Sequence, residues 1–208
     1  MGVFLANELA NGLGGEIRFS LTNCNNSTRG STLKKKSVFG SDWSGVLNNN
    51  TQVIDGSRNS LLNPNRDAKG YLRVKPFTGA LETLSSITRL GFSEIHIVSR
   101  VDPEFWIKER VRAWLRQHGF ESVVPLSRLH FCEKWHEKAP LCERLGVTHF
   151  IDDRLEALEP MVGKIEHLLL FRPWTKEDKP RWHLVEDGKV VLVKSWTEVR
   201  KYLQTHSH

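Results

Sequence analysis

The sequence lacks any apolar run close to the roughly 20 residues that a membrane-spanning helix requires. Cysteine is scarce, because only Cys24, Cys132 and Cys142 occur in 208 residues and they lie far apart. A small, odd number of separated cysteines argues against a disulfide framework and for a reducing compartment. We therefore expect a cytoplasmic protein that does not act at a membrane. The acid-poor start leaves organelle targeting open, but it shows no signal-peptide pattern.

Extremes of composition are also missing. Apolar residues make up 39% of the chain and charged residues 26%, which are ordinary values for a globular protein. These values exclude a mainly disordered, collagen-like or coiled-coil chain. A chain of this length can bury a core without disulfides or structural metals, and it is long enough for one domain with a tail.

The positive charge is unevenly distributed. The net charge is +6, and residues 1–36 alone carry five basic and two acidic residues. Residues 20–36 are rich in Ser, Thr, Asn and Gly and show no apolar period. We predict a basic, flexible tail over 1–36 and one domain over 37–208. The mildly basic balance of the domain suits phosphorylated substrates, small or macromolecular, and is compatible with nucleic acid.

From residue 37 onward, short apolar runs alternate with stretches of helical periodicity. The pattern predicts strands over 38–41, 95–98, 129–132, 148–151, 167–171 and 190–193. It predicts helices over 76–90, 102–118, 138–145, 155–161 and 196–203. This alternation is typical of an α/β fold, with a doubly wound, Rossmann-like, mostly parallel sheet and helices on both faces.

Residues 48–75 interrupt the pattern. They are rich in Asn and contain the turn signals Asp55-Gly56 and Asn63-Pro64. The segment is long enough for a β-hairpin flap but hardly for a domain. We therefore expect an essentially uncapped site, which would admit large substrates or use a partner as a lid.

Polar side chains follow several of the predicted strands. Asp42, Ser99 and the pair Asp152-Asp153 each stand where a strand ends, and Lys138 begins the helix after another strand. Ligands of doubly wound sheets bind at these carboxyl ends. Three converging carboxylates repel one another unless a cation lies among them, and hard oxygen ligands suit Mg²⁺.

The same set fits phosphate chemistry. Ser99 and Lys138 would hold phosphoryl oxygens, one by a hydrogen bond and one by charge. Asp42 would be free to act as a nucleophile, because carboxylates can form aspartyl-phosphate intermediates. Each residue alone has an ordinary role as a turn former, helix cap or solvated side chain, so the prediction depends on their order and separation as a set.

That order resembles the haloacid dehalogenase (HAD) superfamily of phosphohydrolases. The family's first motif, a strand followed by Asp-x-Asp-Gly-Thr/Val, is similar to Asp42-Trp43-Ser44-Gly45-Val46. Its strand ending in Ser or Thr, its Lys and its paired acids are similar to Ser99, Lys138 and Asp152-Asp153. The resemblance covers about residues 38–203. Response-regulator receiver domains use similar residues, but in a different order, which excludes them.

The resemblance implies roles for these residues. Asp42, Ser44, Ser99 and Lys138 would be catalytic, and Ser99, Lys138 and Gly45 would bind phosphate. Asp42, Asp152, Asp153 and the backbone carbonyl of Ser44 would bind Mg²⁺. Ser44 departs from the family pattern, because the family has there an Asp that acts as general acid and base. Losing such a group typically slows a reaction by roughly 10²–10⁴-fold.

Two interpretations therefore remain open. The first is a Mg²⁺-dependent phosphohydrolase that passes through phospho-Asp42 and is slow because of Ser44. The second is a non-catalytic HAD-like module that binds a phosphate-containing ligand, nucleic acid or a protein partner.

Two minor signals lie elsewhere in the chain. Residues 170–174 and 193–199 resemble the tail of the 5′(3′)-deoxyribonucleotidase branch of the superfamily. His130, Cys132 and His136 invite a zinc interpretation, but their spacing fits no zinc-finger pattern and no fourth ligand is evident.

Overall fold

The computed structural model describes residues 36–49, 70–103, 105–173 and 175–207. All of them belong to one of the two units into which the chain divides, residues 34–208. The predicted tail over 1–36, apart from its last residue, lies outside the described residues. So does the middle of the predicted flap, residues 50–69. Both of these features stay predictions.

The described residues form one parallel sheet of six strands in the order β3-β2-β1-β4-β5-β6. Its strands are β1 (Ser37–Ser41), β2 (Phe92–Arg100), β3 (Leu129–Cys132), β4 (His149–Asp152), β5 (His167–Phe171) and β6 (Val191–Val193). The strands β1 and β4 lie side by side at the centre of the sheet. From β1 the chain adds β2 and β3 on one side, and from β4 it adds β5 and β6 on the other. The predicted doubly wound α/β sheet is confirmed.

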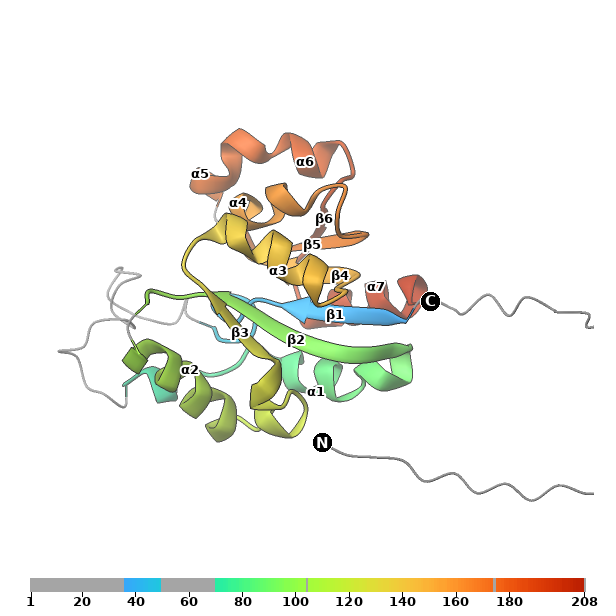
Figure 1. The fold of residues 1–208 in the computed structure, drawn as a ribbon. Helices are drawn as coiled ribbons and strands as arrows, with labels where there is room; N and C mark the ends of the chain where they lie inside the picture. Colours follow the sequence, from blue (N-terminus) through green and yellow to red (C-terminus); the bar gives the residue numbers. More distant parts are fainter. Residues whose placement is uncertain (1–35, 50–69, 104, 174, 208) are drawn as a thin grey trace, which may run out of the picture. The chain divides into compact units, whose positions relative to one another are not determined.

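Helices cover both faces of this sheet (Figure 1). One face carries α1 (Ala80–Ser85), α2 (Phe105–Gln117) and α7 (Trp196–His206). The other carries α3 (Lys138–Arg144), α4 (Leu155–Leu158), α5 (Thr175–Asp178) and α6 (His183–Glu186). None of the helices in the described part of the chain is long and apolar enough to cross a membrane.

The inner strands supply side chains to two separate cores. Successive residues of a strand point to opposite faces of the sheet. On β2, Ile97 packs into the core under α1, α2 and α7, whereas Val98 packs into the core under α3, α4 and α6. Ile151 and Phe150 divide in the same way on β4. Burial on both faces explains why these strands read as continuous apolar runs rather than alternating ones.

The helices differ in detail from the sequence prediction. The helix expected over 76–90 is split, because α1 ends at Ser85 and a 3-10 turn follows over Ile87–Leu90. The Ser86 hydroxyl donates to the carbonyl of Thr83 at 2.8 Å, and serine side chains of this kind compete with the helical backbone bonds. The short helices α5 and α6 were not expected from the sequence.

Candidate functional site

The site lies at the carboxyl end of β1, where the strand order turns back. Asp42 is the first residue after β1, and its N–H donates to the carbonyl of Ile151 on β4 at 2.9 Å. The Asp42 Oδ1 accepts from the N–H of Trp43 at 2.7 Å. These two bonds fix the backbone and one carboxylate oxygen of Asp42, whose residue is only 6% exposed.

A buried ion pair connects this carboxylate to β4 and α3. Lys138, the first residue of α3, is fully buried, and its Nζ lies 2.6 Å from Asp152 Oδ2 and 3.2 Å from Asp42 Oδ2. Burial by itself would lower the pKa of Lys138, but the charges of Asp152 and Asp42 outweigh it and raise that pKa above its usual value. The ammonium group therefore stays charged.

The Asp152 carboxyl, the acidic partner of Lys138, has a shifted pKa as well. Burial raises the pKa of the Asp152 carboxyl, and the neighbouring Asp42 charge adds to the rise, while Lys138 opposes it. Asp42, Asp152 and Asp153 each place a carboxylate oxygen within 4.8 Å of the others. Within the described residues, this is the one group of three or more His, Cys, Asp or Glu side chains that comes together in this way. The Lys138 ammonium contacts two of these three carboxylates, those of Asp42 and Asp152.

The loop after β1 is held close to this acidic cluster. Gly45 has a φ of +76°, and a Cβ built on it would lie 2.3 Å from Asp153 Oδ2. Only glycine therefore admits Asp153 at this position. The N–H of Gly45 donates to Asn48 Oδ1 at 3.0 Å, so in this structure it is engaged within the loop. Ser44, which precedes Gly45, is partly exposed and forms an isolated β-bridge with Asn48.

Ser99 completes the predicted set. The parallel register pairs Ser41 with Ile97, so Ser99 stands two residues further along β2, beyond the end of β1. Ser99 is fully buried, and its Oγ has no hydrogen-bond partner among the described residues. Buried hydroxyl groups normally have a partner, so this one fits a ligand oxygen. The structure thus gathers Asp42, Lys138, Asp152 and Asp153, and places Ser99 at the same edge.

The zinc interpretation gains no support in the structure. The Nε2 of His130 lies 3.1 Å from the Nδ1 of His96, so its partner is another strand residue. Cys132 directs its Sγ toward the Ser99 carbonyl at 3.8 Å, and burial raises the pKa of this thiol to about 11. His130, Cys132 and His136 do not form a ligand group.

Several residues near the site were missed by the sequence analysis. Arg100 and Arg154 directly follow Ser99 and Asp153, and both place their Cζ near the ring of Trp135, at 5.1 Å and 4.9 Å. Asp178 on α5 is also buried, and its Oδ1 accepts from the N–H of Leu155 at 2.9 Å. This bond fixes the start of α4 just after the acid pair. No motif marks these residues, because their contacts join segments that are distant in sequence.

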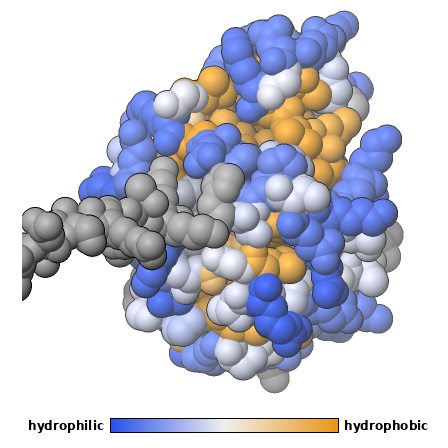
Figure 2. Space-filling model, turned by 90° about the vertical axis from the view of Figure 1, so that its right-hand side faces the viewer, coloured by the Kyte–Doolittle hydropathy of each residue, from blue (hydrophilic) through white to orange (hydrophobic). Residues whose placement is uncertain are grey.

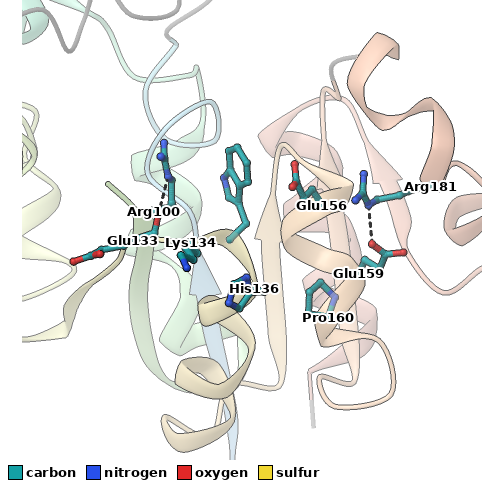
Figure 3. A pocket seen from close by; sticks show the side chains of 9 residues that line it. Arg100, Glu133, Lys134, His136, Glu156, Glu159, Pro160 and Arg181 are labelled. Carbon is teal, nitrogen blue, oxygen red and sulfur yellow. Dashed lines mark hydrogen bonds and ion pairs between the residues drawn. The ribbon is translucent and has the colours of Figure 1, made fainter. Parts of the chain in front are cut away.

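A groove of about 420 Å³ opens beside these residues (Figure 3). Its walls come from the end of β2, the turn after β3, helix α4 and the 3-10 turns Glu159–Met161 and Lys179–Arg181. They comprise Arg100, Glu133, Lys134, Trp135, His136, Glu156, Glu159, Pro160 and Arg181.

The amino-terminal ends of the strands lie on the side of the molecule that faces the viewer in Figure 2. Apolar and polar residues are intermixed on this surface. A second cavity of about 430 Å³ lies at the start of β4 and β5, and its lining includes Val147, Ile165 and Leu168. Asp42, Asp152 and Asp153 lie at the carboxyl ends of the strands, so this second cavity is not part of the candidate site.

The chain is similar to known proteins in sequence and in structure. No family model matches the chain. A Bacillus cereus protein named "Putative nucleotidase" is 28% identical over 141 residues, which cover 68% of this chain and 65% of the relative, slightly less than two thirds of its length.

Two solved structures are similar over most of the chain. D,D-heptose 1,7-bisphosphate phosphatase from Burkholderia thailandensis has a TM-score of 0.47 and 12% identity, over 82% of this chain and 97% of that chain. A "putative haloacid dehalogenase-like hydrolase" from Burkholderia xenovorans has a TM-score of 0.48 and 17% identity, over 80% and 98%. The last name is that of the superfamily that the sequence motifs resemble.

Proposed function

We propose that this protein is a Mg²⁺-dependent phosphohydrolase that forms an aspartyl-phosphate on Asp42. The observation that supports this proposal best is the meeting of Asp42, Lys138, Asp152 and Asp153 at the turning point of the strand order, with the Ser99 hydroxyl at the same edge. The name of the Bacillus relative favours a nucleotide as the phosphate ester.

The residues present fit a magnesium ion. Three buried carboxylates within 4.8 Å of one another supply hard oxygen donors, and the Lys138 ammonium contacts only those of Asp42 and Asp152. Asp42, Asp152, Asp153 and the backbone carbonyl of Ser44 would hold the ion. When bound, it supplies positive charge that offsets the carboxylates and the phosphoryl oxygens. This leaves Lys138 available to orient Asp42.

The reaction would begin with the phosphoryl group held between Ser99 and Lys138. The Ser99 hydroxyl donates to one phosphoryl oxygen, and the Lys138 ammonium attracts another. An oxygen of Asp42 bonds to phosphorus as the ester P–O bond breaks, and the leaving oxygen keeps the electron pair. Water then attacks phosphorus, the bond to Asp42 breaks, and inorganic phosphate leaves.

Ser44 limits the two proton transfers in this sequence. A hydroxyl group neither protonates an alkoxide nor deprotonates water well near neutral pH. Aryl esters leave without a proton, so they would react at Asp42 faster than alkyl esters. Release of phosphate from Asp42 would be slow for both.

The second candidate function is phosphate recognition without turnover. Ser44 favours it, because the usual acid/base is missing. The engagement of the Gly45 N–H by Asn48 favours it as well, because this donor is then not offered to a phosphoryl group. A phosphate-binding module would keep Ser99, Lys138 and the metal ligands but release no product.

Two measurements separate these functions. With p-nitrophenyl phosphate and Mg²⁺, the proposal predicts a burst of nitrophenol followed by a slow steady state, and Asp42→Asn removes both. Calorimetric titration with Mg²⁺ should show weak binding that is lost in Asp152→Asn. If nitrophenol release is the same in Asp42→Asn as in the wild type, the proposed nucleophile is wrong. If Mg²⁺ and phosphate bind but no ester is cleaved, the binding module is the correct function.

A further inference from the structure

The groove beside the acidic cluster contains an unusual arrangement of planar groups. The guanidinium groups of Arg100 and Arg154 both lie about 5 Å from the ring of Trp135, within the range of cation–π contacts. Trp135 is itself only partly buried, so its ring borders the groove rather than the core. We call these three residues the Arg100–Trp135–Arg154 platform.

The platform is fixed to the candidate site through the backbone. Arg100 follows Ser99, Arg154 follows Asp153, and Trp135 precedes Lys138 by three residues. The 3-10 turn that holds Trp135 packs against α4. The backbone of the platform is therefore next to the residues that would hold the phosphate, and we expect the next group of such a ligand to reach the groove.

The side chain of Arg100 is held in place by polar contacts. Its Nε donates to the carbonyl of Glu133 at 3.1 Å, a bond drawn in Figure 3, and another guanidinium nitrogen donates to Asp102 at 2.9 Å. These bonds and the contact with Trp135 orient the guanidinium plane before a ligand arrives. A platform that is already ordered loses little conformational entropy on binding.

The charges in the groove indicate which part of a ligand it fits. With the platform and the ion-pair partner of Arg100 included, the number of cationic side chains equals the number of carboxylates: Arg100, Lys134, Arg154 and Arg181 against Asp102, Glu133, Glu156 and Glu159. Arg181 and Glu159 are paired directly at 2.7 Å, as Figure 3 shows. A groove without excess positive charge does not favour a second phosphate. It favours an uncharged, planar and polar group.

We propose that this groove binds the base of a nucleotide, with the Arg100–Trp135–Arg154 platform as the stacking surface. The inference rests on the proposed function, because the phosphate of the same nucleotide would occupy the site at Ser99 and Lys138. Bases stack on indole rings and on guanidinium planes. The Arg100 side chain is 34% exposed beside Trp135, so the exposed part of the platform suits a base. Carboxylates such as Glu156 would accept hydrogen bonds from sugar hydroxyls or base amino groups.

The test measures binding rather than turnover. Three ligands are titrated into the wild-type chain with Mg²⁺ by calorimetry: inorganic phosphate, a simple alkyl phosphonate, and a purine nucleoside phosphonate. Phosphonates keep the charged group but contain a C–P bond that phosphohydrolysis does not cleave. We expect the nucleoside ligand to bind roughly tenfold more tightly than the alkyl ligand, the size of one stacking contact.

Substitutions then show which residue causes the preference for the nucleoside phosphonate over the alkyl phosphonate. Trp135→Ala should bring the ratio of the two affinities close to one, and Trp135→Phe should keep most of it. The matched control is Trp182→Phe, a partly buried tryptophan that packs on the core beneath α6. It should leave the ratio unchanged.

The outcomes distinguish this inference from the function on which it rests. If all three ligands bind but the ratio is close to one in the wild type, or survives in Trp135→Ala, the groove does not recognise a base and the phosphohydrolase proposal stands. If neither phosphate nor the phosphonates bind, both proposals are wrong.

Discussion

The ammonium group of Lys138 donates to the Asp152 carboxylate at 2.6 Å, and both side chains are buried from solvent. The contact joins the start of α3 to the end of β4, and so joins two of the motifs that the sequence shows only as separate residues. A buried ion pair of this kind is costly to break, because the remaining charge has no water around it.

Lys138→Met should therefore destabilise the fold strongly when metal is absent. We expect the free energy of unfolding to fall by about 3–5 kcal/mol, because the buried carboxylates of Asp42 and Asp152 would lose the ammonium group that they contact. Saturating Mg²⁺ should restore part of the loss. Urea unfolding in EDTA and in Mg²⁺ measures both effects.

Lys164→Met is the control for this experiment. Lys164 lies 3.4 Å from Glu143 at the surface and is 46% exposed, so its pair should contribute about 0–1 kcal/mol. An equal loss of stability in the two variants would show that the Lys138 pair is not the buried interaction described here.

The close approach of Gly45 to Asp153 gives a second prediction. Gly45→Ala would combine a left-handed backbone with a Cβ placed 2.3 Å from Asp153 Oδ2. Gly146→Ala has a similar φ of +66° with no atom within 4 Å of its Cβ, so it shows the backbone strain alone. We expect each variant to lose about 1–2 kcal/mol to strain. Only Gly45→Ala should also weaken Mg²⁺ binding, by about 10–100-fold, because Asp153 must move.

Thermal melting and calorimetric Mg²⁺ titration of both glycine variants test this difference. Unchanged Mg²⁺ affinity in Gly45→Ala would mean that Asp153 does not contribute to a metal site.

Ser44→Asp tests the missing acid/base. A carboxyl group at this position should raise the turnover of an alkyl phosphate such as a nucleoside 5′-monophosphate by up to about 10²–10⁴-fold. The gain should be smaller for p-nitrophenyl phosphate, whose leaving group needs no proton. Steady-state rates with both esters provide the comparison. A Ser44→Asp variant that binds Mg²⁺ but cleaves neither ester would favour the binding-module function.

The histidine pair on β2 and β3 predicts an acid-sensitive stability. Burial lowers the pKa of His96 and also that of His130, so the unfolded chain binds more protons than the folded one. The stability contributed by neutral His96 and His130 is present above the unfolded pKa of about 6.5 and is lost as the pH falls below it. These two histidines should therefore lower the melting temperature between pH 7.5 and 5.5, whereas the raised pKa of Asp152 acts in the opposite direction.

Replacing His130 by Gln should reduce this pH dependence, because one buried titrating group is removed. His183→Gln, at an exposed position on α6, is the control. A pH dependence that is equal in the wild type and in His130→Gln would contradict the assignment.

The local sequence determined the strands of this protein, the type of its sheet and the residues at the strand ends. Continuous apolar runs predicted the strands, and the structure reproduces 129–132 and 167–171 residue for residue. Strands alternating with helices predicted the parallel sheet, because such connections allow few other arrangements. The end of a strand can be recognised from the local sequence. The candidate residues at or after the carboxyl ends of the strands could therefore be named before their distances were known: Asp42, Ser99, Lys138, Asp152 and Asp153.

Only the tertiary structure decided which other side chains join them. The strand order brings β1 between β2 and β4, and Asp42 within 3.2 Å of Lys138 as a result. The stacking of Arg100 and Arg154 on Trp135, and the capping of α4 by Asp178, join segments that no local pattern connects. Local periodicity fixes which face a residue takes, whereas contacts between elements depend on how the whole chain packs.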